Sequence, residues 1–295
     1  ASVLGIALSQ LGVTTFAIDP SVGYRNVAER LGRIEPEAFV GIPISQLGRM
    51  AFGWGPRFLK KSIVVDGWFP GATTFKELMS HPGSRQEKPP VSVDSPCHVL
   101  YTTGSTGPAK PAMYTQRQFV NVYRTAHHSW RFDEINGVPV DMAAFPAFMY
   151  IVLSFGGTMV VPPINFARVK PATTPAKAVC DVIEAAKVTS LFASPAFLER
   201  IANHAKANPA PLRSLKRVIG GGAPLFAPLV KSLLEVIHPE GDACPNYGAT
   251  EALPSTEISG RETLAETAER TANGEGICVG VPFPHVEVRT VTPID

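Results

Sequence analysis

Short apolar segments alternate with amphipathic segments along most of the chain, and this alternation restricts the fold more than any other feature. The apolar segments are rich in β-branched and aromatic residues, as in Ser62–Asp66 and Thr189–Ala193. The segments between them repeat apolar residues at helical spacing, as in Ala176–Lys187. Strands that alternate with helices predict a parallel sheet covered by helices, so the sequence indicates an α/β fold.

The same periodicities give a residue-level prediction of the elements. Helices are expected at 3–11, 22–33, 44–52, 75–79, 116–130, 176–187 and 195–207, with one more after Pro224. Strands are expected at 14–18, 38–42, 62–66, 99–101, 158–161, 189–193 and 216–219. Residues 257–273 are polar and predict a surface excursion with a helical turn. Clean alternation from Val286 to Val291 predicts an antiparallel strand with one solvated face.

Composition excludes several classes of protein. The chain has 295 residues, of which 45% are hydrophobic, and a formal net charge of +2, so no strong field points to nucleic acid or an anionic membrane. No apolar run reaches the roughly 18 residues of a transmembrane helix. The four cysteines are far apart and form no C-x-x-C pair. This spacing favours reduced thiols in a cytoplasmic protein over a disulfide framework or a zinc site.

A hydroxyl- and glycine-rich stretch follows the predicted strand Val99–Tyr101. It contains Thr102, Thr103, Gly104, Ser105, Thr106 and Gly107 and closes on Lys110. Backbone N–H groups in such turns form an anion-binding nest, and a lysine adds a point charge suited to phosphate. The spacing differs from G-x-x-x-x-G-K-[ST], because two residues separate Gly107 from Lys110. The stretch predicts a phosphate-binding loop, with a mobile surface turn as the alternative.

Two further stretches carry candidate ligand contacts. A strand at 216–219 runs into Gly220, Gly221, Gly222, Ala223 and Pro224, and ligands bind α/β sheets at the carboxyl ends of strands. Consecutive glycines admit a flat ring against the backbone, although a tight turn without a ligand remains possible. The second stretch offers an amide that can read a base edge, a stacking ring, a hydroxyl and a carboxylate able to hold Mg²⁺: Asn246, Tyr247, Thr250 and Glu251. Taken alone, a glutamate such as Glu251 is more often a solvated surface charge.

An aromatic-rich segment contains Phe145, Phe148 and Met149 and ends at Tyr150. Packing in the core is the simplest interpretation of such a segment. The pair His127 and His128 lies at the end of a predicted helix, where a histidine is a favourable partner for the helix dipole.

Taken in order, these stretches resemble the adenylate-forming superfamily of acyl-CoA synthetases, fatty-acyl-AMP ligases, luciferases and peptide-synthetase adenylation domains. The stretches that match its motifs are Thr102–Lys110, Gly221–Leu225, Asn246–Glu251 and Val279–Pro282. The resemblance implies the large N-terminal ATP-binding domain of that fold, with layered α/β sheets and a small β-rich part. It implies that residues 1–295 are this domain, truncated at both ends and without the C-terminal lid domain.

The resemblance also implies roles for single residues, with ATP as substrate and Mg²⁺ as cofactor. Thr102, Thr103, Ser105, Thr106 and Lys110 would hold the β- and γ-phosphates, within the loop that includes Gly104 and Gly107. Gly221, Gly222, Ala223 and Pro224 would line the adenine, Asn246 would hydrogen-bond it, and Tyr247, beside Gly248, would stack on it. Thr250 would contact the α-phosphate, Glu251 would bind Mg²⁺, and Phe145, Phe148 and Met149 would border an acyl pocket.

A narrower resemblance is to the β-lactone synthetases of bacterial long-chain olefin biosynthesis. It rests on Pro36–Pro43, Phe145–Phe148 and Tyr247–Pro254. It implies activation of a long-chain 2-alkyl-3-hydroxy acid as an acyl-adenylate, followed by closure to a β-lactone with release of AMP and pyrophosphate. Other enzymes of the same pathway would be its partners. A fatty-acyl-CoA or fatty-acyl-AMP ligase, and a non-catalytic nucleotide-binding module, remain alternatives.

The sequence departs from the superfamily pattern in two respects. Pro111 stands where the family usually has glycine after the lysine. The ribose-binding aspartate, the hinge and the lid lysine of the family would lie beyond Asp295. The chain by itself is therefore expected to be weakly active or inactive.

Overall fold

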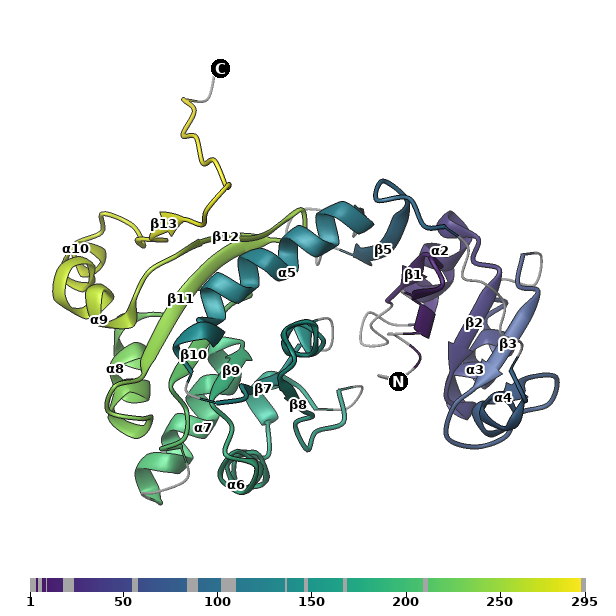
Figure 1. Cartoon of the computed structure of the whole chain (residues 1–295), viewed down its shortest axis with the longest axis horizontal. Helices are drawn as coiled ribbons and strands as arrows, with labels where there is room; N and C mark the ends of the chain where they lie inside the picture. The colour runs from purple at the N-terminus through teal and green to yellow at the C-terminus, as the bar shows by residue number, and fades with distance from the viewer. Residues whose placement is uncertain are drawn as a thin grey trace. The chain divides into compact units, whose positions relative to one another are not determined.

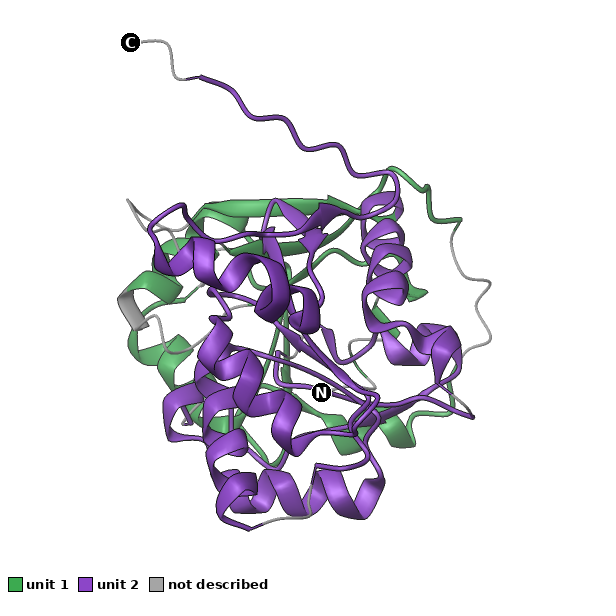
Figure 2. Cartoon of the chain, turned by 90° about the vertical axis from the view of Figure 1, so that its left-hand side faces the viewer, with its two compact units in different colours: residues 1–116 green, residues 117–295 purple. Residues whose placement is uncertain are grey.

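The computed structural model describes residues 4, 7–8, 10–17, 24–54, 58–83, 90–101, 110–135, 137–145, 148–166, 169–208 and 212–292. Its chain divides into two compact units, Ala1–Gln116 and Arg117–Asp295, which Figure 2 colours separately. Each unit has its own sheets and its own core, and each is described by itself.

The first unit contains two three-stranded sheets and three described helices. One sheet has the order β2-β3-β4 and is parallel, and the other has the order β1-β5-β6 with β1 parallel and β6 antiparallel to β5. The strands are β1 (Thr15–Phe16), β2 (Ala38–Gly41), β3 (Lys61–Val64), β4 (Thr73–Thr74), β5 (Pro96–Tyr101) and β6 (Pro111–Thr115). The helices are α2 (Tyr24–Ile34), α3 (Pro43–Ala51) and α4 (Phe75–Ser80).

Apolar packing and one aromatic contact hold α2 in the first unit. Val27 and Leu31 of α2 are buried with Trp54 in a small core cluster. Tyr101, the last residue of β5, donates a hydrogen bond from its hydroxyl to the Arg30 carbonyl oxygen at 3.2 Å. The Arg30 guanidinium lies 4.7 Å from the centre of the Tyr101 ring, a cation–π distance. These contacts connect α2 to the strand that precedes the predicted phosphate loop.

The second unit is built on a seven-stranded sheet with the order β13-β12-β11-β10-β9-β7-β8. The strands from β8 to β11 are parallel, whereas β12 and β13 are antiparallel to their neighbours. The strands are β7 (Val140–Ala143), β8 (Thr158–Val160), β9 (Ser190–Ala193), β10 (Arg217–Gly220), β11 (Asp242–Ala249), β12 (Ala252–Glu257) and β13 (Val281–Pro282). The longer helices are α5 (Gln116–Trp130), α6 (Ala176–Ala186), α7 (Pro195–Ala207) and α8 (Ala227–Val236).

Helices cover both faces of this sheet, as Figure 1 shows. On one face α6, α7 and α8 pack on strand residues such as Met142, Leu191 and Val218. On the other face α5 packs through Ala126 and Trp130 on residues that include Phe192 and Ile219. Because side chains alternate along a strand, the buried segment Arg217–Gly220 contributes to both faces.

Short helical segments complete the second unit. A continuous helical stretch after β12 combines α9 (Gly260–Glu262), the π-helical η6 (Thr263–Thr267) and α10 (Ala268–Ala272). Ser259 caps its start by accepting a hydrogen bond from the Arg261 N–H at 3.2 Å. The remaining segments are 3₁₀ turns: η2 (Phe132–Glu134), η4 (Val152–Phe155) and η5 (Pro171–Thr173). Within the described residues, no helix combines the length and apolarity that crossing a bilayer requires.

Most predicted elements are confirmed within one or two residues, including α2, α3, α5, α6 and α7. The predicted first helix is described only at residues 4, 7–8 and 10, which are helical. The predicted strand at 286–291 is wrong. These residues form no strand in the structure, and Val288 and Val291 are 52% and 84% exposed. Alternation alone does not make a strand when no neighbouring strand accepts its backbone hydrogen bonds.

Candidate functional site

The glycine turn and the Asn246 stretch lie next to each other at the carboxyl ends of β10 and β11. Gly220 is in parallel register with Pro245, so Gly221 and Asn246 are the next residues on adjacent strands. The Gly221 N–H continues the ladder on the other side, donating to the Ala193 carbonyl oxygen at 3.1 Å. The two predicted adenine-contacting stretches are therefore neighbours in space, as the rule for α/β sheets anticipates.

The glycine turn needs residues without side chains. A Cβ on Gly221 would lie 2.8 Å from Cε2 of Phe192, which is too close for any real Cβ. Gly222 has φ +83°, a left-handed conformation that favours glycine, and a Cβ there would lie 3.3 Å from Cζ of Phe145. Gly222, Ala223 and Pro224 are exposed, so this backbone is accessible to a flat ring.

The aromatic residues proposed to border an acyl pocket form a cluster beneath this turn. The Phe192 ring lies 5.1 Å from Phe145 and 4.7 Å from Phe148, measured between ring centres. Met149 is 5% exposed and belongs to the core between α5 and the sheet. These contacts agree with core packing. The role of these residues beside an acyl chain stays a prediction.

Thr250 and Glu251 form the turn of a β-hairpin. Ala249 pairs with Ala252, which leaves Thr250 and Glu251 as the two connecting residues between β11 and β12. The pairing shifts register between Tyr247 and Ala249, and a Cβ on Gly248 would lie 3.0 Å from the Ala252 carbonyl oxygen. Tyr247 is 54% exposed as a residue, which suits a ring available for stacking. The sequence did not predict this hairpin.

The exposed Glu251 carboxylate suits Mg²⁺ of the kind that nucleotides carry. Among the described residues, no three His, Cys, Asp or Glu side chains are grouped to hold a metal ion. A nucleotide-bound Mg²⁺ does not need such a group, because it takes one or two carboxylates together with phosphate oxygens and water. Glu251 in an exposed turn therefore fits this donor set.

The predicted phosphate loop lies outside the described residues, which omit 102–109. The contacts predicted for Thr102, Thr103, Gly104, Ser105, Thr106 and Gly107 therefore stay predictions. The approach strand is confirmed as β5, which ends at Tyr101. Lys110 is exposed and directly precedes β6. β5 and β6 pair antiparallel, with Tyr101 opposite Pro111.

A buried ionic network that the sequence did not predict surrounds Asn246. The Arg217 guanidinium pairs with a Glu257 carboxylate oxygen, and its Nε donates to the Ser129 carbonyl oxygen at 2.7 Å. Ser129 donates its hydroxyl proton to the other Glu257 oxygen. Burial raises the pKa of the Glu257 carboxyl, while the nearby Arg217 charge and the hydrogen bonds from Ser129 and Asn246 oppose the shift. Hydrogen bonds from neighbouring groups thus compensate part of the cost of burying the Arg217–Glu257 ion pair.

A second buried carboxylate lies on the same face of the sheet. Asp141 of β7 is fully buried, and its Oδ1 accepts hydrogen bonds from Trp130 Nε1 at 3.0 Å and from the Ser190 hydroxyl. Among the described residues, its Oδ2 has no hydrogen-bond partner. Burial raises the pKa of the Asp141 carboxyl to about 7, although these hydrogen bonds lower it. The sequence predicts neither carboxylate. It predicts no strand at 140–143, and it places Glu257 in a surface excursion, whereas Glu257 ends β12 with a side chain that is only 11% exposed.

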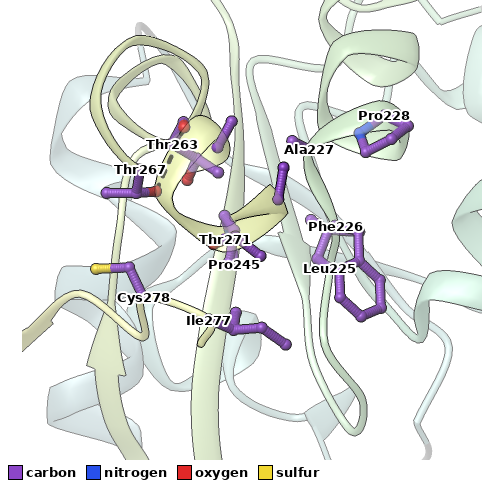
Figure 3. A pocket seen from close by; sticks show the side chains of 12 residues that line it. Leu225, Phe226, Ala227, Pro228, Pro245, Thr263, Thr267, Thr271, Ile277 and Cys278 are labelled. Atoms are coloured by element: carbon purple, nitrogen blue, oxygen red, sulfur yellow. Dashed lines mark hydrogen bonds between the residues drawn. The ribbon is translucent and has the colours of Figure 1, made fainter. Parts of the chain in front are cut away.

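A cavity of about 280 Å³ lies on the opposite side of β11 (Figure 3). Pro245 lines it together with Leu225 and Phe226, and Thr263, Thr267 and Thr271 enclose it from the helical stretch after β12. Consecutive residues of a strand point to opposite faces, so Pro245 faces this cavity while Asn246 faces the network with Ser129. No predicted site residue lines the cavity. Leu225 and Pro245 nevertheless make it adjacent in the chain to the proposed contacts Pro224 and Asn246.

The fold is that of the adenylate-forming enzymes, as comparison with solved structures shows. The structure is similar to that of a luciferase-like enzyme from the mealworm Zophobas morio, with a TM-score of 0.76 and 19% sequence identity over 96% of this chain and 64% of that one. Residues 2–293 match the model of the AMP-binding enzyme family, and the chain belongs to this family.

Two relatives that differ in the reaction their names describe are similar to this chain in sequence. The chain is 32% identical to an olefin β-lactone synthetase of Stenotrophomonas maltophilia over 98% of its own length and 51% of that protein's length. It is 31% identical to a feruloyl-CoA synthase of an Amycolatopsis species over 69% of its length and 38% of that protein's length. The chain thus spans about half of the length of the first relative and less of the second.

Proposed function

We propose that this chain binds ATP with Mg²⁺ and serves an adenylate-forming ligase, with residues 1–295 contributing its AMP-binding domain. The observation that carries the proposal is that the glycine turn, exposed at residues 222–224, directly follows Gly220, which pairs with Pro245, the neighbour of Asn246 on the adjacent strand. Family membership supports the nucleotide, because the matched family is that of AMP-binding enzymes.

In the proposed reaction, the acid substrate attacks the α-phosphorus of ATP through a carboxylate oxygen and pyrophosphate leaves. The protein contributes positioning and charge neutralisation. Lys110 and the hydroxyls of 102–106 would neutralise the departing phosphates. Thr250 would hold the α-phosphate, and Glu251 would hold the Mg²⁺, which supplies further neutralisation of phosphate charge.

The more specific proposal is that the acid is a long-chain 2-alkyl-3-hydroxy acid. Its 3-hydroxyl would attack the acyl-adenylate carbonyl, lose its proton and expel AMP, which closes a four-membered β-lactone. The similarity to the olefin β-lactone synthetase over 98% of this chain supports this choice. Phe145, Phe148 and Met149 would lie beside the alkyl chains, and enzymes that make the hydroxy acid or consume the lactone would be partners in the cytoplasm.

Transfer of the acyl group to coenzyme A is a second candidate, because a feruloyl-CoA synthase is nearly as similar over the part that aligns. The distinguishing experiment supplies the protein with ATP, Mg²⁺ and a 2-alkyl-3-hydroxy acid, with and without coenzyme A, and identifies the products by mass spectrometry. A β-lactone formed without coenzyme A supports the first candidate. A thioester with no lactone establishes the second.

Nucleotide binding is tested independently of the product. We expect Lys110→Ala and Glu251→Ala each to weaken binding of MgATP by about tenfold or more, because each removes a charge that faces phosphate or metal. Isothermal titration of both variants, compared with the exposed-surface variant Lys177→Ala, measures this. Wild-type affinity in both variants would overturn the site assignment.

A further inference from the structure

The carboxamide of Asn246 is held in one orientation by buried neighbours. Its Nδ2 lies 3.2 Å from the Ser129 hydroxyl oxygen and 3.4 Å from a Glu257 carboxylate oxygen. Ser129 is fully buried and Glu257 nearly so, with a side chain that is 11% exposed. The amide end that faces this pair is therefore removed from bulk water.

The available hydrogen-bond donors and acceptors determine which end of the Asn246 amide faces Ser129 and Glu257. Ser129 has one hydroxyl proton and donates it to Glu257, so its oxygen can only accept from Asn246. Glu257 is paired with Arg217, a guanidinium that stays protonated, so its carboxylate also accepts. A reversed amide would place its carbonyl oxygen against these two acceptors. The nitrogen must face the network, which leaves Oδ1 on the other side.

We propose that Ser129, Glu257 and Arg217 act as positioning residues that make the ligand-facing end of Asn246 an acceptor, so that it selects a purine with a 6-amino group. This inference rests on the proposed function, because it takes the base to lie against the neighbouring glycine turn. Adenine donates from its 6-amino group, whereas hypoxanthine presents a 6-oxo acceptor. A fixed Oδ1 accepts from the first and repels the second.

Inosine triphosphate is the matched probe, because it carries the same ribose and phosphates as ATP. We expect the wild-type chain to bind MgATP at least about tenfold more tightly than MgITP, the range for one hydrogen bond replaced by an unpaired acceptor. Isothermal titration with both nucleotides gives the ratio of dissociation constants. This ratio reports the orientation of the amide and is insensitive to a uniform loss of affinity.

Glu257→Gln changes the network with almost no change in shape. The carboxamide that this substitution introduces can accept from Arg217 through its carbonyl oxygen, and its nitrogen then faces Asn246 as a donor. The Asn246 amide is expected to reverse, so the ATP-to-ITP ratio should fall by about tenfold, to near or below one. Ser129→Ala should lower the ratio by a smaller factor. Ser232→Ala, which removes a hydroxyl at the exposed α8 surface, should keep the wild-type ratio.

The possible outcomes distinguish failure of the positioning role from failure of the proposed ATP binding. A wild-type ratio near one, or an unchanged ratio in folded Glu257→Gln and Ser129→Ala, overturns the positioning role while ATP binding stands. Absence of any ATP binding by the wild-type chain overturns the proposed function itself. If Glu257→Gln does not fold, Asn246→Ala decides. It should bring the ratio to near one, and retention of the wild-type ratio there overturns the inference.

Discussion

Asn246 and Tyr247 are consecutive residues in different environments. Asn246 is tied to buried partners, whereas Tyr247 leaves 54% of its surface exposed. In the proposed site, the exposed Tyr247 ring offers a face on which a purine base stacks.

Tyr247 therefore provides a direct test of base stacking. We expect Tyr247→Ala to weaken MgATP binding by about tenfold, since a base–aromatic stack contributes roughly 1–3 kcal/mol. Tyr247→Phe is the matched control and should bind like the wild type, because it retains the ring. Titration calorimetry measures both. Equal affinity of the Ala variant and the wild type would exclude stacking at this residue.

Asp141 predicts a specific dependence of stability on pH. Its folded-state pKa is raised to about 7, above the value near 4 of an unfolded chain. The contribution to stability is therefore complete below about pH 4 and is lost as the pH rises through about 7. The wild-type free energy of unfolding should fall relative to that of Asp141→Asn by on the order of 2 kcal/mol between about pH 5 and pH 8.

Urea unfolding at a series of pH values measures this difference. Asp181→Asn, at an exposed carboxylate paired with Lys177, is the control and should follow the wild type. If the free energies of unfolding of the wild type and Asp141→Asn changed in parallel with pH, the Asp141 carboxyl would have the same pKa in the folded and unfolded states.

At the scale of elements, sequence patterns located the longer helices and several parallel strands but missed β4, β7 and the hairpin of β11 and β12. Val230, Leu233 and Ile237 mark α8 because they recur at helical spacing and all are buried. Asp242–Ala249 contains proline, asparagine and glycine, residues depleted in strands. Its strand geometry comes from pairing with β10 and β12, which no local pattern reports.

The same limit applies to the site. Glycine and aromatic residues at strand ends carry a local signal, so the sequence points to Gly221, Gly222 and Tyr247 as candidates, and their contacts with a nucleotide stay predictions. Ser129 and Glu257 could not, because they are 128 residues apart and have a role only after α5 packs beside β12.

The helical stretch after β12 depends on close contact with β11 at its first residue. A Cβ on Gly260 would lie 2.1 Å from the Ala243 carbonyl oxygen, and backbone cannot yield by that much. We expect Gly260→Ala to destabilise the second unit by about 2–4 kcal/mol. Thermal unfolding followed by circular dichroism measures the change.

Gly32 in α2 supplies the matched comparison. It has no atom within 4 Å of an added Cβ and an ordinary helical backbone, so Gly32→Ala should be neutral or stabilising. A Gly260→Ala protein as stable as the wild type would mean that α9 and β11 can separate without cost.

At the scale of the whole molecule, nucleotide binding should increase the free energy of unfolding. A ligand that binds only the folded state at about 100 times its dissociation constant adds about 2.7 kcal/mol. We expect AMP to produce this increase in the second unit, which contains the glycine turn and Asn246, and to protect the amides of β10 and β11 from hydrogen exchange. The same AMP concentration should give a smaller increase with Asn246→Ala. Protection absent from β10 and β11 would contradict the predicted location of the base.

The polar residues beneath α5 also determine how the strands align. Asp141, Ser190, Arg217 and Asp242 occupy one row across adjacent parallel strands, each in register with the next. Sliding any of these strands by one residue would turn its polar side chain to the opposite face, among the apolar side chains of α6, α7 and α8. For Arg217 that slip would leave a charge in an apolar core, at a cost of several kcal/mol. These four polar residues therefore disfavour a shifted strand register. Apolar residues at the same four positions would not do so, because they could be buried on either face of the sheet.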